Sequence, residues 1–182
     1  CFADSQIPIY TSKGFKQIGK IKIGDLVLSH NGKFRDVTNI IRTPKYKDDL
    51  ITIKVEYENW KNKPREYKLT TTPEHPYLTK KGWKKASELK KTDDLIMLGN
   101  TCKECNKIYP IFTNENSNFC SLICANKYTT KKQFKDPKQH KIRSIKTIFA
   151  TCKIKDKNVW KPKKAKTLYN ISVAKDESYI AK

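Results

Sequence analysis

The chain has 182 residues, enough for one core of ordinary size or for a main domain with a small insertion. Hydrophobic residues make up 37% of it, so it can fold, while a net charge of +21 favours polyanions such as nucleic acid. A surface rich in lysine that only keeps the protein soluble is the alternative. No apolar run approaches roughly eighteen residues and no signal-peptide pattern is present, so we expect a soluble protein without a membrane partner.

Short apolar runs separated by turn residues fill the first hundred positions. The run Leu50–Tyr57 alternates apolar and other residues with a period of two, which is typical of a strand with one buried face. The sequence His30-Asn31-Gly32-Lys33 supplies an Asn-Gly hairpin signal, and His30 itself is expected to be a solvated surface residue. A short helical turn is predicted over residues 83–89. Further strands are predicted at 7–10, 26–29, 37–42, 67–70, 77–79 and 95–98.

The series of short apolar runs ends near Gly99, and strand-like sequences return at residues 148–154 and 167–173. We therefore predict a mostly β protein in which residues 1–99 and 148–182 form one discontinuous domain. Residues 100–147 would then be a compact insertion of mixed helix and strand, and no helix of ordinary length is expected before residue 120.

Four of the six cysteines cluster in the insertion as Cys102-x2-Cys105-x14-Cys120-x3-Cys124. This spacing fits tetrahedral coordination of a structural Zn²⁺ by four thiolates, and free buried thiols are the alternative. A paired metal-binding pattern, rather than a scattered disulfide framework, indicates a reduced, cytoplasmic protein.

Cys1 and the pair Thr72 and His75 carry the candidate catalytic chemistry. A thiol is the best natural nucleophile near neutral pH. Attack of the Cys1 sulfur on the carbonyl carbon of a preceding residue would close a favourable five-membered ring. A histidine three positions after a hydroxyl residue can protonate a leaving amide nitrogen while the hydroxyl orients the reacting groups. An ordinary surface loop is the alternative for residues 72–75.

Together these residues resemble the Hint fold, which inteins and hedgehog autoprocessing domains share. Residues 1–34 look like the first intein block, and residues 69–76 look like the second, with its Thr-x-x-His core at Thr72 and His75. Residues 168–181 resemble the block that precedes the C-terminal splice junction. The resemblance implies a horseshoe-like β domain.

The resemblance also implies autocatalytic protein splicing between flanking extein polypeptides. Cys1 would perform an N-to-S acyl shift, His75 would protonate the departing nitrogen, and Thr72 would hold the scissile bond. Asn170 stands where the family usually has Asp, and Glu177 or Ser178 where it commonly has His. A segment ending in Asn would complete the reaction, and we expect a short complementary intein peptide to supply it in trans.

The stretch 127–166 holds fifteen Lys or Arg against two Asp, a net charge of +13, so a salt-sensitive contact with DNA is a further expectation. Two alternatives to splicing stay open at this point. One is a zinc-dependent DNA-binding module or homing-endonuclease remnant, and the other is a hedgehog-like domain whose thioester is resolved by a sterol or water.

Overall fold

A computed structural model describes residues 1–58, 64–111, 118–133 and 148–181. Two antiparallel sheets dominate it, and the helical elements are α1 (Leu122–Gln133) and two 3₁₀ turns, Ile18–Lys20 and Ala86–Glu88. The strands are β1 (Pro8–Thr11), β2 (Gly14–Gln17), β3 (Leu26–Leu28), β4 (Phe34–Tyr46), β5 (Leu50–Glu58), β6 (Pro64–Thr71), β7 (Pro76–Thr79), β8 (Gly82–Lys85), β9 (Asp94–Thr101), β10 (Ile108–Pro110), β11 (Ile148–Trp160) and β12 (Lys166–Val173). None of the helices described is long and apolar enough to span a membrane.

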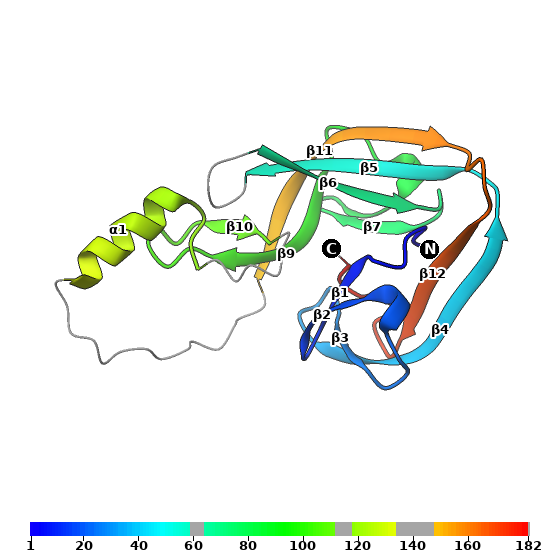
Figure 1. Cartoon of the computed structure of the whole chain (residues 1–182), viewed down its shortest axis with the longest axis horizontal. Helices are drawn as coiled ribbons and strands as arrows, with labels where there is room; N and C mark the ends of the chain where they lie inside the picture. Colours follow the sequence, from blue (N-terminus) through cyan, green and yellow to red (C-terminus); the bar gives the residue numbers. More distant parts are fainter. Residues whose placement is uncertain (59–63, 112–117, 134–147, 182) are drawn as a thin grey trace.

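The first sheet has the order β12-β4-β3-β1-β2, and the second has the order β6-β5-β11-β9-β7-β8 with β10 added beside β9. The long strands β4 and β12 pair with one another, as do β5 and β11. In Figure 1 the β5–β11 pair runs along the top of the molecule and the β4–β12 pair along its right side. Both marked chain ends lie between the two sheets in this view, while α1 projects away from them. The predicted mostly β architecture is therefore confirmed.

The core follows from the alternation that the sequence predicted. Ile51, Ile53 and Val55 on β5 are each at most 2% exposed, and they join one continuous cluster that also contains Phe2. Burial of such side chains is the main force that holds the two sheets together. Because Phe2 is only 2% exposed, the start of the chain is packed into the fold instead of lying on its surface.

The predicted helical turn over residues 83–89 is only partly correct. Gly82–Lys85 forms strand β8, which pairs with β7 in a tight hairpin, and a 3₁₀ turn covers only Ala86–Glu88. Gly82 has φ of +99°, the left-handed region in which glycine carries no steric penalty, so this residue sets the hairpin that extends the strand.

Strand β9 continues through the predicted boundary at residue 99 and pairs with both β10 and β11. The division of the chain into a discontinuous domain and an insertion at 100–147 therefore stays a prediction. Helix α1 begins after residue 120, in agreement with the expected absence of earlier long helices from the described part.

Gly99 on β9 lies where the neighbouring strands β10 and β11 leave no room for a side chain. A Cβ atom at this position would lie 2.7 Å from the Ala150 Cβ and 3.1 Å from the Tyr109 carbonyl oxygen. We expect Gly99→Ala to lower the free energy of unfolding by about 1–3 kcal/mol, because the strands must separate to admit the methyl group. Urea unfolding measures this loss. The double variant Gly99→Ala/Ala150→Gly should recover part of it, and equal stability of Gly99→Ala and the parent chain would contradict the close approach.

Candidate functional site

A cleft of about 520 Å³ opens between the start of the chain, the β6–β7 connection and the segment after β12. All four residues predicted to be catalytic line it. Cys1 comes from the start of the chain, Thr72 and His75 come from the β6–β7 connection, and Asn170 comes from β12. The same cleft is lined by several residues that the sequence did not single out together, namely His30, Trp83, Asp176, Glu177, Ser178 and Tyr179.

The backbone nitrogen of Cys1 is the best-defined atom of the site. It lies 3.1 Å from Thr72 Oγ1 and 3.2 Å from His75 Nδ1. The Thr72 amide donates to the Cys1 carbonyl at 3.0 Å, and the His75 amide donates to the Thr72 carbonyl at 3.1 Å. The tight turn from Thr72 to His75 therefore places both side chains on one side, facing the nitrogen, as the Thr-x-x-His spacing predicted.

Main-chain pairing of Phe2 holds Cys1 against this turn. The Phe2 amide donates to the Tyr169 carbonyl at 2.9 Å and the Tyr169 amide returns a bond at 2.8 Å, while the Ala3 amide donates to the Thr70 carbonyl. The first residues thus bridge β6 and β12. This pairing fixes the position of the Cys1 backbone without using its thiol.

Burial makes the contact between Cys1 and His75 a contact between neutral groups. The His75 ring packs against the Phe2 ring at 4.5 Å and the Tyr77 ring at 5.1 Å between centroids. This burial, and secondarily the nearby Cys1 ammonium, lowers the pKa of His75 from 6.5 to about 3. Burial also lowers the pKa of the Cys1 amine from 8.0 to about 6. At neutral pH the imidazole is unprotonated and can accept a proton.

Asn170 is held by a residue from the last segment of the chain. The Tyr179 hydroxyl donates to Asn170 Oδ1 at 2.7 Å, and burial raises the pKa of that hydroxyl. Tyr179 also packs near Phe2, with ring centroids 6.4 Å apart. An amide carries no charge, so Asn170 serves here as a hydrogen-bonding group.

The expectation that His30 is a solvated surface residue is wrong. His30 is half-buried, its Nδ1 is hydrogen-bonded to Ser178 Oγ, and its ring meets Trp83 edge-on at 5.4 Å. No local pattern reveals these contacts, since Ser178 lies 148 positions away in the sequence. The Asn-Gly turn was predicted correctly, but a turn signal does not say what its side chains face.

An ion pair anchors the segment that carries Ser178. Arg35 Nε lies 2.6 Å from Asp176 Oδ2, and the Ser29 hydroxyl donates to the same oxygen at 2.8 Å. The Arg35 hydrogen bond, with that of Ser29, lowers the pKa of Asp176 to about 2. Lys175 and Glu177 on either side have φ of +66° and +49°, a left-handed conformation that side chains rarely adopt.

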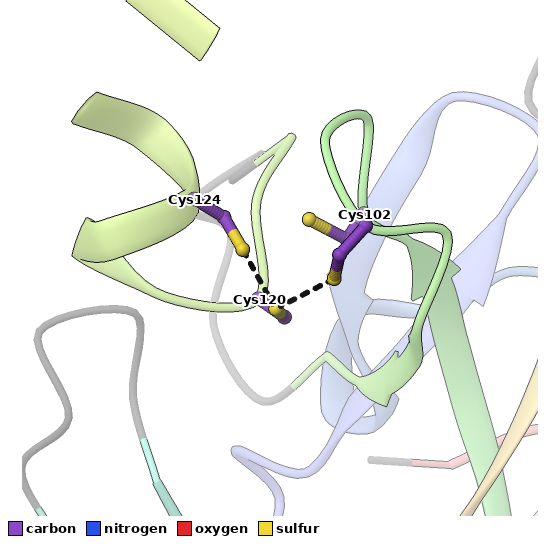
Figure 2. A group of neighbouring side chains, drawn as sticks. Cys102, Cys120 and Cys124 are labelled. Atoms are coloured by element: carbon purple, nitrogen blue, oxygen red, sulfur yellow. Dashed lines mark hydrogen bonds between the residues drawn. The ribbon is translucent and has the colours of Figure 1, made fainter. Parts of the chain in front are cut away.

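The four clustered cysteines form a second candidate site, a metal centre. Their sulfur atoms all lie within 4.8 Å of one another, although they come from residues 102–105 and 120–124. Figure 2 shows Cys120 and Cys124, before and inside α1, facing Cys102 at the end of β9.

The geometry fits a tetrahedral metal ion with thiolate ligands. Cys105 Sγ lies 3.6 Å from Cys120 Sγ, which lies 3.7 Å from Cys124 Sγ. Zinc–sulfur bonds of about 2.3 Å in a tetrahedron separate the sulfur atoms by about 3.8 Å. The two printed separations match this value, so the described cysteines could hold a metal ion. In the basic stretch 127–166, residues 134–147 lie outside the described part, so the DNA contact stays a prediction.

Comparison with sequence families and curated proteins identifies relatives of part of the chain. The family described as "Pretoxin HINT domain" matches residues 8–112. A "Probable translation initiation factor IF-2" of Methanocaldococcus jannaschii is 40% identical over 79 residues, which are 42% of this chain and 6% of that protein. An uncharacterized protein of the same organism is 43% identical over 63 residues, 35% of this chain and 7% of that protein. The chain thus spans a small fraction of each relative's length.

Solved structures with a similar fold are inteins and an intein-like domain. A variant of the Ssp DnaB mini-intein has a TM-score of 0.57 at 10% identity, covering 99% of this chain and 93% of that one. The bacterial intein-like domain from Clostridium thermocellum has a TM-score of 0.54 at 15% identity, covering 96% and 88%. The DnaX mini-intein from Spirulina platensis has a TM-score of 0.54 at 12% identity, covering 97% and 92%. At these identities the likeness establishes the fold, and the predicted Hint architecture is confirmed.

Proposed function

Because the chain belongs to the pretoxin HINT domain family, we propose that it is a self-processing domain that cuts the peptide bond preceding Cys1. The observation that carries this proposal is the position of the Cys1 nitrogen, 3.1 Å from Thr72 Oγ1 and 3.2 Å from His75 Nδ1. In a precursor this nitrogen belongs to the scissile peptide bond. An acid–base residue and a hydroxyl therefore meet at the atom that must leave.

The first step is an N-to-S acyl shift. The Cys1 sulfur attacks the carbonyl carbon of the preceding residue, a C–S bond forms, and the C–N bond breaks. The thiol loses one proton and the leaving nitrogen gains one, so the step consumes no proton overall. A neutral His75 can take up the thiol proton and deliver it from Nδ1 to the nitrogen. Thr72 holds that nitrogen in place through its hydroxyl.

Burial of His75 bears on the second half of this role, the delivery of the proton to the leaving nitrogen. In the precursor there is no Cys1 ammonium, so its contribution to the low pKa disappears, while burial of the ring remains. A ring that resists protonation gives up a proton readily once it has taken one, which favours transfer to the departing amine.

Completion of splicing would need an acceptor nucleophile and a segment ending in Asn, and we propose that a complementary peptide supplies this segment in trans. The Ile180 carbonyl accepts from the Tyr10 amide at 3.3 Å, and the Ile180 amide donates to the Leu28 carbonyl at 2.8 Å. Ala181 forms a bridge with Ile9. A further segment joining the fold after Ala181 would start between β1 and β3, beside the cleft.

We also propose that Cys102, Cys105, Cys120 and Cys124 hold a structural Zn²⁺. The ion would tie α1 to the end of β9 and would play no part in the acyl shift, because its ligands do not line the cleft. All six cysteines are free thiols, which supports a reducing, cytoplasmic location for both the nucleophile and the metal ligands.

A reporter polypeptide fused before Cys1 tests the proposal. Addition of a strong thiol to the parent fusion should release the reporter, and Cys1→Ala should abolish release because no thioester can form. Cys152→Ala is the matched control, since Cys152 is buried on β11 outside the cleft lining, and it should release the reporter like the parent. A parent fusion that stays intact, even with a candidate C-terminal peptide added, would rule out the proposed function.

A further inference from the structure

A second histidine enters the cleft from the turn after β3. His30 Nδ1 is hydrogen-bonded to Ser178 Oγ, and the edge contact with Trp83 at 79° between ring planes fixes the tilt of the imidazole. His30, Trp83 and Ser178 all line the cleft that Cys1 lines. Two independent contacts thus orient an acid–base side chain in the cleft that the proposed nucleophile also lines.

The backbone around His30 is tied to the segment that carries Ser178. Ser29, which is fully buried, donates its hydroxyl to Asp176, and Arg35 binds the same carboxylate. Beyond Ser178, the Ile180 amide donates to the Leu28 carbonyl at 2.8 Å. These bonds hold the chain two residues before and two residues after Ser178, so the fold keeps Ser178 against the His30 ring.

This geometry leaves one ring nitrogen of His30 for chemistry. Nδ1 is engaged by Ser178, and no contact of Nε2 is seen within the described residues. If Nδ1 donates to the Ser178 hydroxyl, Nε2 carries the lone pair and can accept a proton. In that tautomer Nε2 is the base, and the Ser178 hydroxyl accepts the Nδ1–H hydrogen bond that supports it.

His75 is poorly placed to serve a second step. Cleavage of the peptide bond before Cys1 in the first step would leave a free amine at this nitrogen. His75 Nδ1 lies 3.2 Å from this nitrogen, so we expect it to stay engaged with the product of the first step. Within the described part of the chain, His30 is the other histidine, and it approaches the cleft from a different element.

We propose that His30, oriented by Ser178, is the general base that activates water for hydrolysis of the Cys1 thioester. The inference rests on the proposed function, because it requires that thioester. Water oxygen attacks the thioester carbonyl carbon, a C–O bond forms, and the C–S bond breaks. His30 takes the proton that water loses and returns it to the Cys1 thiolate. The products are an upstream polypeptide with a free carboxyl group and the chain with a restored Cys1 thiol.

The reporter fusion of the full chain separates this step from the first one. Release without added thiol measures hydrolysis, and release with dithiothreitol measures thiolysis, in which the attacking thiolate needs no base. His30→Ala should lower the ratio of the hydrolysis rate to the thiolysis rate by about 100-fold, at the lower end of general-base effects. Ser178→Ala should lower it less, since the base remains but is less well oriented.

Two further variants and a rescue distinguish a base from a structural residue. Imidazole added to His30→Ala should restore part of the hydrolysis rate, which a purely structural role would not allow. Lys33→Ala, an exposed residue in the same turn, should leave the ratio at the parent value. An unaltered ratio in His30→Ala, or a ratio that imidazole does not raise, would overturn the role of His30 and leave the proposed function of Cys1 unaffected. Absence of thiolysis in the parent would overturn the proposed function, and this inference with it.

Discussion

Replacement of His75 by Ala should slow thiol-induced release of an upstream reporter by about 10²–10⁴-fold, the usual contribution of a positioned acid–base residue. The reason is that His75 Nδ1 lies 3.2 Å from the nitrogen that must leave, and Thr72 at 3.1 Å offers only a neutral hydroxyl. Single-turnover kinetics, followed by the fraction of reporter released over time, measure the effect. Thr72→Ala should cause a smaller loss, because the hydroxyl orients the nitrogen but does not protonate it.

His75 also packs between Phe2 and Tyr77, so its removal can destabilise the fold as well as the chemistry. Leu98→Ala is the control for this effect. Leu98 is 6% exposed and belongs to a small second cluster with Leu28 and Ile180, so its truncation should cost about 2–5 kcal/mol of stability. At a temperature where both variants stay folded, Leu98→Ala should release the reporter near the parent rate. Release by His75→Ala within a few-fold of the parent would contradict the assigned role.

Loss of the metal site should strongly weaken metal binding and the folding of the segment that carries the cysteines, and should leave cleavage before Cys1 unchanged. We expect the purified chain to bind about one Zn²⁺ and Cys120→Ser to bind it far more weakly, because the Cys120 sulfur has neighbours at 3.6 and 3.7 Å. Structural zinc in small fingers contributes about 10–16 kcal/mol of apparent binding energy near pH 7, more than a short segment gains from its own core. Metal analysis and the absorption of the cobalt-substituted protein report directly on the site.

Cys152→Ala supplies the matched control for this experiment as well. Cys152 lies on β11 opposite Leu95, and it is not part of the cysteine cluster, so its removal should leave the zinc content unchanged. Chelation of the metal should loosen α1, measured as faster amide hydrogen exchange over Leu122–Gln133, while thiol-induced release stays close to the parent rate. Equal metal content in Cys120→Ser and the parent would argue against the four-thiolate site.

Much of the fold was predictable because its signals are local. The alternation of Ile51, Ile53 and Val55 marks a strand whatever the rest of the chain does, and the strand appears where it was predicted. The same holds for the Thr72-to-His75 spacing, since a four-residue turn brings its two ends together by itself. The paired cysteine spacing is also a local signal, and the four sulfur atoms do converge.

The second half of the cleft was not predictable in the same way. Ser29 meets Asp176, and His30 meets Ser178, only because the end of β3 and the segment after β12 are neighbours in three dimensions. Their local sequence reads as a turn and a polar loop, and no periodicity links positions more than a hundred residues apart. The strand β8 was misread for a related reason. Its partner β7 decides its conformation, not the propensity of residues 83–85.

The most direct test of the account is the chemical nature of the new C-terminus on the released upstream segment. If Cys1 forms a thioester, cleavage by 2-mercaptoethanesulfonate should give a segment that ends at the residue before Cys1 and carries that thiol as a C-terminal thioester. Intact-mass spectrometry distinguishes this product from a free carboxyl terminus, and hydroxylamine should convert it to a hydroxamate. A released segment that never carries the added thiol, or that ends at another residue, would contradict the central role of Cys1.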